Sequence, residues 1–253
     1  MQWLIALVAL TAMEIVLGID NIVFIAIVTS SLPAQQQPAA RRLGLLLALG
    51  MRVLLLLTLQ WIMGLQQPIL HLTDLGLPAA WFASWDSHHW EHFNGVSWRD
   101  VILIVGGLFL IAKSVHEIHK KLEGQHDQQH AIGTATFSGV LVQIALLDII
   151  FSLDSVITAV GMANQIWVMI VAVVLAIGVM IVFAESVSRF VERHPTVKML
   201  ALSFLILIGV MLLAEGIGTE INKGYIYFAM FFALVVEFLN IKARQVSHVR
   251  HAA

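Results

Sequence analysis

Two stretches of this sequence place acidic residues at the same spacing within apolar surroundings. The first reads Glu14-Ile-Val-Leu-Gly-Ile-Asp20-Asn21, and the second reads Asp148-Ile-Ile-Phe-Ser-Leu-Asp154-Ser155. Hard divalent cations such as manganese, magnesium and calcium prefer carboxylate, amide and hydroxyl oxygens as ligands. The pattern therefore predicts an all-oxygen cation site, which does not by itself distinguish manganese from magnesium. Its candidate ligands are Glu14, Asp20, Asn21, Asp148, Asp154 and Ser155.

The spacing within each stretch limits how its two acids can meet. Successive residues of an α-helix are about 100° apart, so positions six apart point about 120° apart. Both acids of one stretch can face one ion only if the helix unwinds between them. Gly18 and Ser152 lie in these intervals, and Gly18 is the better candidate for a break. An unwound turn would also free backbone carbonyls as ligands.

The composition excludes a soluble domain. The 253 residues are 59% hydrophobic and 12% charged, whereas soluble domains carry about 25% charged residues. The mean hydropathy is +0.89. The chain has no cysteine, which excludes disulfides, zinc–thiolate sites and cysteine nucleophiles. A formal net charge of −2 favours neither nucleic acid nor an acidic partner.

A membrane-spanning helix needs about 20 mostly apolar residues. We therefore expect an all-α polytopic membrane protein with seven transmembrane helices. The seven qualifying segments are 3–29, 43–65, 100–119, 137–163, 165–187, 198–217 and 224–242. The long connection 66–99 is rich in tryptophan and predicts an interfacial loop with an aromatic belt. We interpret its His88, His89 and His92 as a solvated cluster rather than a metal site.

Lysine and arginine residues outside the spans are distributed unevenly between the two sides of the membrane. The side of the amino terminus carries Arg99 and Lys223. The opposite side carries Arg41, Arg42, Lys120, Lys121, Arg189, Arg193, Lys198, Lys242, Arg244 and Arg250. The positive-inside rule then predicts that the amino terminus faces out and the carboxy terminus faces the cytoplasm.

The two acidic stretches belong to a longer internal repeat. Ala48-Leu-Gly50 in span two matches Ala176-Ile-Gly178 in span five, and Gly107-Leu-Phe-Leu-Ile-Ala-Lys113 in span three matches Gly209-Val-Met-Leu-Leu-Ala-Glu215 in span six. Because each repeat has three spans, the second half crosses the membrane upside down. Inverted repeats are typical of secondary transporters, whose substrate site lies at the repeat interface near the midplane. Chance similarity between apolar helices is the alternative interpretation.

The repeat predicts both the domain organisation and the depth of the acids. We expect one membrane domain, 1–253, with repeat one at 1–120, repeat two at 137–217 and an extra helix at 224–242. Glu14 and Asp148 then fall near the midplane. Asp20 lies toward the cytoplasm and Asp154 toward the outside. We hypothesise that the midplane acids bind the ion while the other two complete the site from alternate sides.

Further charged residues lie within the spans. A charge at the bilayer centre costs about 2.5–3.5 kcal/mol even on lenient scales, so the central ones need partners or water. Acids outnumber bases, which favours a cation pathway. We expect Arg52 to pair with an acid of the site and to keep the empty site neutral. Lys113 and Glu215 occupy equivalent repeat positions and are not expected to pair. Glu185 and Glu237, near the cytoplasmic ends of their spans, are as consistent with anchoring as with function.

These motifs, together with Lys223-Gly-Tyr-Ile-Tyr-Phe-Ala-Met230 and the following Glu237, resemble the TerC family of integral membrane proteins. The resemblance covers essentially the whole chain. It implies a relation to LysE-type transporters, placement in a bacterial inner membrane, and a link to manganese efflux or tellurium resistance. The acidic motif residues of the family match Glu14, Asp20, Asp148 and Asp154.

The leading hypothesis is therefore an exporter of divalent cations, manganese first, with proton exchange through the same carboxylates. We expect no permanent cofactor, and partners limited to the lipid bilayer, the metal ion and protons. An intramembrane aspartyl protease is a weaker alternative, because Asp154 follows Phe151-Ser-Leu and lacks the Gly-x-Gly-Asp pattern. We therefore do not expect an enzyme. A third alternative is a membrane scaffold or metallation factor for exported proteins.

Overall fold

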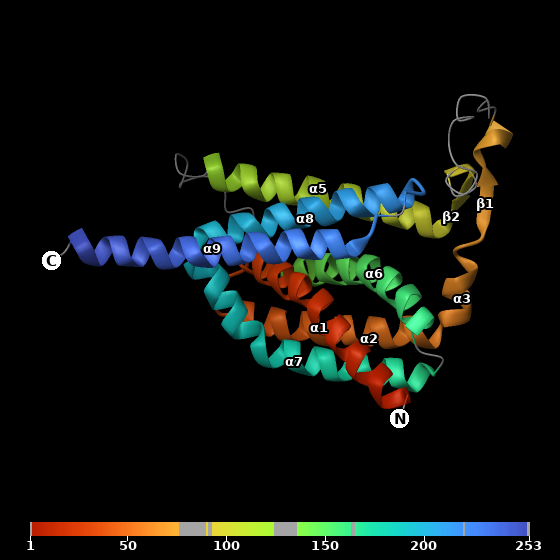
Figure 1. Ribbon diagram of the computed structural model, residues 1–253, viewed down its shortest axis with the longest axis horizontal. Coiled ribbons are helices and arrows are strands. Elements are labelled where there is room, and N and C mark those ends of the chain that lie inside the picture. The colour runs from red at the N-terminus through yellow and green to blue at the C-terminus, as the bar shows by residue number, and fades with distance from the viewer. Residues whose placement is uncertain are drawn as a thin grey trace.

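The computed structural model describes residues 2–75, 90, 93–123, 136–162, 165–219 and 221–251. Helices dominate these ranges (Figure 1), which confirms the all-α prediction. The elements are α1 (Gln2–Thr29), α2 (Gln37–Leu57), α3 (Leu59–Gly64), β1 (Pro68–His71), the short 3₁₀ helix η1 (Leu72–Leu75), β2 (Gly95–Ser97), α5 (Trp98–Glu123), α6 (Phe137–Met162), α7 (Ile166–Arg193), α8 (Pro195–Gly216) and α9 (Lys223–His251).

Five helices of the described chain are long and apolar enough to cross a bilayer. They contain the stretches Trp3–Thr29, Trp98–Leu122, Ile166–Arg193, Pro195–Gly216 and Lys223–Ala243. These five helices confirm the prediction of a polytopic membrane protein, whereas the count of seven spans stays a prediction. α6 adds a shorter apolar stretch, Phe137–Leu153.

Span two differs most from its predicted bounds. The expected helix 43–65 is divided, because α2 ends at Leu57 and α3 begins at Leu59. Between them, the Thr58 hydroxyl donates a hydrogen bond to the Leu54 carbonyl at 2.8 Å. Such local side-chain bonds offer the backbone an alternative to the continuous helix. α2 also begins at Gln37, so that its first turns carry arginines rather than apolar residues.

The predicted interfacial loop contains a small antiparallel hairpin. β1 pairs with β2, with His71 opposite Gly95. The hairpin brings the end of α3 close to the start of α5, where the Arg99 amide donates to the Leu65 carbonyl at 3.1 Å. His88, His89 and His92 lie outside the described residues, so their predicted exposure stays a prediction.

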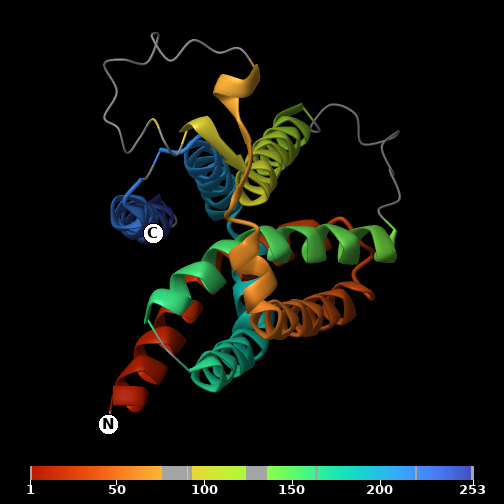
Figure 2. The same ribbon diagram turned by 90° about the vertical axis from the view of Figure 1, so that its right-hand side faces the viewer.

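The helices pack as two neighbouring groups. α1 and α2 pack against α6 and α7, while α5 packs along α8 beside them (Figure 2). α9 packs mainly against α8 and extends past the rest of the bundle toward the carboxy terminus (Figure 1). Buried hydrophobic side chains of all these helices form one continuous core. The candidate site lies where α1, α2, α6 and α7 meet.

α5 and α8 approach each other at two glycines. A β-carbon on Gly107 would lie 2.6 Å from the Gly209 carbonyl oxygen, and one on Gly209 would lie 2.9 Å from the Gly107 carbonyl oxygen. Small residues allow the backbones of membrane helices to come this close. The pair therefore sets the spacing of the α5–α8 group.

We predict that Gly209→Val separates α5 from α8, because the added carbons meet backbone that cannot move aside. Overpacking of this kind costs about 1–3 kcal/mol. Thermal unfolding in detergent would show a lower transition temperature for this variant. Gly178→Val is the matched control, since a β-carbon on Gly178 meets no atom within 4 Å. Equal transition temperatures for the two variants would contradict the prediction.

Candidate functional site

One arginine joins two acids in the centre of the bundle. The Arg52 Nη1 atom of α2 pairs with the Glu14 carboxylate of α1, and its Nε atom lies 3.2 Å from Asp148 Oδ1 of α6. All three side chains are at most 5% exposed. The Ser152 hydroxyl donates to the other Asp148 oxygen at 3.1 Å. The structure thus brings Glu14 and Asp148 together, and it gives Arg52 the acidic partners that the sequence predicted.

The sequence predicted that Arg52 keeps the empty site neutral, but one arginine does not cancel two ionised acids. One guanidinium carries a single positive charge, whereas two ionised carboxylates carry two negative charges. Burying such groups is costly unless each charge is paired and hydrogen-bonded. A further positive charge, either a proton or a bound cation, would complete the balance. The group is therefore suited to bind and release cations.

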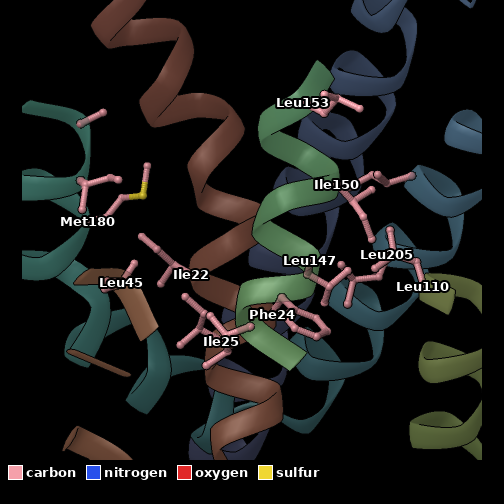
Figure 3. Packing of buried hydrophobic residues seen from close by; sticks show 14 of the residues in the cluster. Ile22, Phe24, Ile25, Leu45, Leu110, Leu147, Ile150, Leu153, Met180 and Leu205 are labelled. Atoms are coloured by element: carbon pink, nitrogen blue, oxygen red, sulfur yellow. The ribbon is translucent and has the colours of Figure 1, made fainter. Parts of the chain in front are cut away.

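A narrow cavity adjoins the ion pairs. It lies between α1, α2, α6 and α7. Its lining is formed by Asn21, Phe24, Ile25, Leu45, Ala48, Arg52, Ile144, Leu147, Asp148, Ile177 and Met180. Figure 3 shows part of the apolar packing around it, with Ile25, Leu45 and Leu147 converging from three helices. Polar groups thus meet in a space with mostly hydrophobic walls, where electrostatic attraction is weakly screened.

The remaining predicted ligands have different outcomes. Asn21 lines the same cavity as Asp148. Ser155 is buried, but its hydroxyl donates to the Ser152 carbonyl at 3.3 Å. The side chains of Asp20 and Asp154 lie outside the described residues. Among the residues that the structure describes, no three histidine or acidic side chains form a group that could hold a metal.

The helical break that the acid spacing suggested is absent. α1 is continuous through Gly18, and α6 is continuous through Ser152. Gly18 has a different role: a β-carbon there would overlap the terminal methyl group of Met180. The glycine makes room for a side chain of α7, and the backbone remains helical.

Sequence reasoning named Ser152 only as a possible helix break, and it did not identify Met180. Ser152 follows Asp148 by four positions, so the two share one helix face and can hydrogen-bond. Met180 follows Gly178 by two positions, as Arg52 follows Gly50. Extending the repeat match by two residues would have identified Met180 as the counterpart of Arg52.

The comparisons with known proteins show the family of this chain. Residues 1–252 match the sequence profile of the family described as "Integral membrane protein TerC family". The chain belongs to the TerC family. This match covers both acidic motifs and all the described helices. It supports the family resemblance noted from the motifs and shows a membrane protein.

Of three relatives of this TerC-family chain, two are similar over nearly their whole length, and the third over less than half of its own. A UPF0053 protein of Haemophilus influenzae is 48% identical over 242 residues, which cover 95% of this chain and 94% of the relative. The Escherichia coli inner membrane protein YgdQ is 48% identical over 239 residues, which cover 94% and 92%. The E. coli inner membrane protein YoaE is 45% identical over 246 residues, 97% of this chain but 44% of the relative. No solved structure matches the chain.

Three further charged residues within the predicted spans have partners away from the central group. Lys113 pairs with Glu117 at 2.8 Å. Glu215 lies 3.6 Å from Arg99 and 3.6 Å from Lys223. Lys113 and Glu215 thus have separate partners. Glu237 accepts a hydrogen bond from Asn240 at 3.3 Å, one turn along α9.

A second ion-pair cluster joins the start of α2 to the end of α7. The Arg41 guanidinium lies 3.1 Å from Glu185 and 3.3 Å from Glu192, and it also donates to Gln37 at 2.9 Å. The arginine is buried, whereas the two glutamates are 44% and 37% exposed. Glu185 also pairs with Arg189 at 3.1 Å. Glu185 therefore links two helices, while both its anchoring and its functional role stay predictions.

We predict that Arg52→Met strongly destabilises the protein, because it leaves two buried acids without their partner. Breaking a buried pair in this way typically costs about 3–5 kcal/mol. The triple variant Arg52→Met, Glu14→Gln and Asp148→Asn removes all the charges and should recover most of the loss. Transition temperature and monodispersity in detergent would measure both effects.

The control for this prediction is Arg189→Met, which alters an arginine that is 64% exposed. An exposed ion pair contributes about 0–1 kcal/mol, so little change is expected. If the triple variant were as unstable as Arg52→Met, charge pairing would not be the role of Arg52.

Proposed function

We propose that this chain is a multi-pass inner-membrane transporter that exports divalent metal cations, with manganese as the leading substrate. The observation that carries the proposal is the pair of buried acids, Glu14 and Asp148, held by one arginine beside a cavity. Ionisable residues buried inside a membrane bundle are expensive and generally mark a substrate or proton pathway. The inner-membrane assignment agrees with the printed names of YgdQ and YoaE.

The chemistry of the donors favours a hard or borderline cation. Glu14 and Asp148 supply carboxylate oxygens, and Asn21 supplies an amide oxygen on the cavity wall. Oxygen ligands suit manganese, magnesium and calcium. We propose that Asp20 and Asp154 hold the ion from the two sides at other stages of transport, because α1 and α6 are unbroken and neither helix can present both of its acids to one ion at once. Ser155 contributes less, since its hydroxyl is already bonded to the backbone.

Arg52 explains how the site remains stable without a metal. Its guanidinium bonds both acids, so the empty site retains a counter-charge. An entering metal ion competes with Arg52 for the same oxygens. Protons compete as well, because a protonated carboxylate is a poor metal ligand. In this proposal, metal and protons are exchanged because they compete for the same acids.

The inverted repeat supplies the movement in this proposal, with repeat one at 1–120, repeat two at 137–217 and α9 outside the symmetry. The packing is consistent with it: α1 lies against α7 as α6 lies against α2, and Gly107 meets its counterpart Gly209. A relation to LysE-type transporters and an outward amino terminus belong to the same proposal. Rocking of one repeat against the other would expose the acids to each side in turn.

The test is manganese flux into vesicles of phosphatidylethanolamine and phosphatidylglycerol that contain the full chain. We expect flux from the wild type, and a loss of about 10- to 100-fold or more for Glu14→Gln and for Asp148→Asn. Glu117→Gln is the matched control, since Glu117 pairs with Lys113 on α5, away from the cavity. The absence of manganese flux under any metal or proton gradient would overturn the proposal.

We further predict that Asp20→Asn and Asp154→Asn each slow manganese flux without preventing membrane insertion. Both residues belong to the motifs that contain Glu14 and Asp148. Flux assays on protein whose yield and monodispersity match the wild type would measure the effect. Wild-type flux from both variants would exclude these aspartates from the site.

A further inference from the structure

Met180 is buried beside the central acids. It lies on α7, is 3% exposed, and lines the cavity together with Asn21, Arg52 and Asp148. Figure 3 shows its side chain reaching from α7 toward α1, with the sulfur near the end of the chain. Four helices meet at this cavity, and Met180 supplies its only sulfur atom among the lining residues that the structure describes.

The backbone of α1 accommodates this sulfur at one particular position. A β-carbon on Gly18 would lie 2.7 Å from the Met180 sulfur and still closer to its methyl group. Gly18 follows Glu14 by four positions, so both lie on one face of α1. The thioether therefore packs against α1 at Gly18, which lies between Glu14 and Asn21 in the sequence. It shares the cavity with two of the oxygen donors, Asn21 and Asp148.

The proposed repeat gives Met180 a counterpart of opposite character. Arg52 follows Gly50 by two positions, and Met180 follows Gly178 by two positions. In one half of the chain, Arg52 contacts Asp148 of α6, which also bonds Ser152. In the other half, Met180 packs against Gly18, the counterpart of Ser152. Equivalent positions thus carry a cation in one half and a neutral soft donor in the other.

A thioether changes which ions an oxygen site prefers. Magnesium and calcium bind oxygen ligands and have little affinity for sulfur. Manganese also suits oxygen ligands, but as a transition metal it tolerates a thioether better than they do, and later and softer divalent metals accept one readily. A leucine would fill a similar volume, so packing alone does not require methionine here. Sulfur beside carboxylates penalises magnesium and calcium relative to transition metals.

We propose that Met180 is a specificity-determining residue that selects transition-metal ions over magnesium and calcium. This inference rests on the proposed transport function and identifies its substrate class. The oxygen donors attract divalent cations in general, and the Met180 sulfur restricts them to those that tolerate a soft ligand. Gly18 serves this selection because it leaves room on α1 for the sulfur at the cavity.

The experiment measures manganese flux in the same vesicles, with the full chain and a range of competing magnesium concentrations. We expect Met180→Leu to retain manganese flux but to be inhibited by roughly tenfold less magnesium, which corresponds to about 1.4 kcal/mol of differential binding. The matched control is Met169→Leu, because Met169 is also 3% exposed on α7 but does not line the cavity. This control should keep the wild-type selectivity.

A second measurement uses the wild type and needs no stable variant. Cadmium and calcium ions have nearly the same radius but differ greatly in affinity for sulfur. Cadmium should therefore inhibit manganese flux at a concentration at least about tenfold lower than calcium does. Equal inhibition by the two ions would overturn the role of the sulfur.

The outcomes separate this inference from the function on which it rests. Manganese flux in the wild type, with unchanged magnesium sensitivity in Met180→Leu, overturns the role of Met180 alone. No manganese flux in the wild type overturns both. Heightened magnesium sensitivity in Met180→Leu, with wild-type behaviour in Met169→Leu, supports the proposal.

Discussion

The structure depends on a single guanidinium that satisfies two carboxylates away from water. Arg52 belongs to α2, Glu14 to α1 and Asp148 to α6, so these contacts fix three helices relative to one another. Because α6 lies in the second half of the chain, the same contacts also tie the two halves together. In a low-dielectric interior, separation of any one of these charges costs several kcal/mol. The central helices therefore have few alternative arrangements.

The surroundings of this group strengthen it. Leu45, Leu147 and Ile177 enclose the charges on the cavity side, and Ser152 satisfies the Asp148 oxygen that Arg52 does not reach. Hydrophobic walls reduce screening, which increases both the attraction between the charges and the cost of an unpaired one. A cation that enters such a cavity is bound strongly only if it replaces the contacts that Arg52 makes. In the proposed function, cation binding is thus joined to a rearrangement of the arginine.

The sequence predicted the features that arise from local pattern. Long apolar stretches produced the helices, and the surplus of acids within them anticipated that Arg52 would have an acidic partner. The acid spacing suggested a break at Gly18, but the helix is intact there because a neighbouring side chain occupies the glycine face. That outcome depends on how α7 packs against α1, which no local pattern records.

Other features depended on contacts between distant residues. β1 and β2 are only four and three residues long and are more than 20 positions apart, so neither has a strand pattern of its own. The end of α2 at Leu57 follows from one hydroxyl of Thr58 within a run of residues that otherwise favour a helix. In the sequence, Met180 is one apolar residue within an apolar run, like an ordinary core residue. Its position beside Asp148 is evident only when four helices are assembled.

The Arg41 cluster makes the contact between α2 and α7 sensitive to the surrounding medium. Its guanidinium is buried, but the glutamates that hold it are more than one-third exposed. Dissolved salt screens exposed charges over about 8 Å at physiological ionic strength and leaves buried ones largely unaffected. The outer junction of these helices therefore weakens as electrolyte accumulates, while the Arg52 group keeps its strength. The ion pairs of Arg41 are therefore sensitive to salt, whereas the buried ion pairs of Arg52 are not.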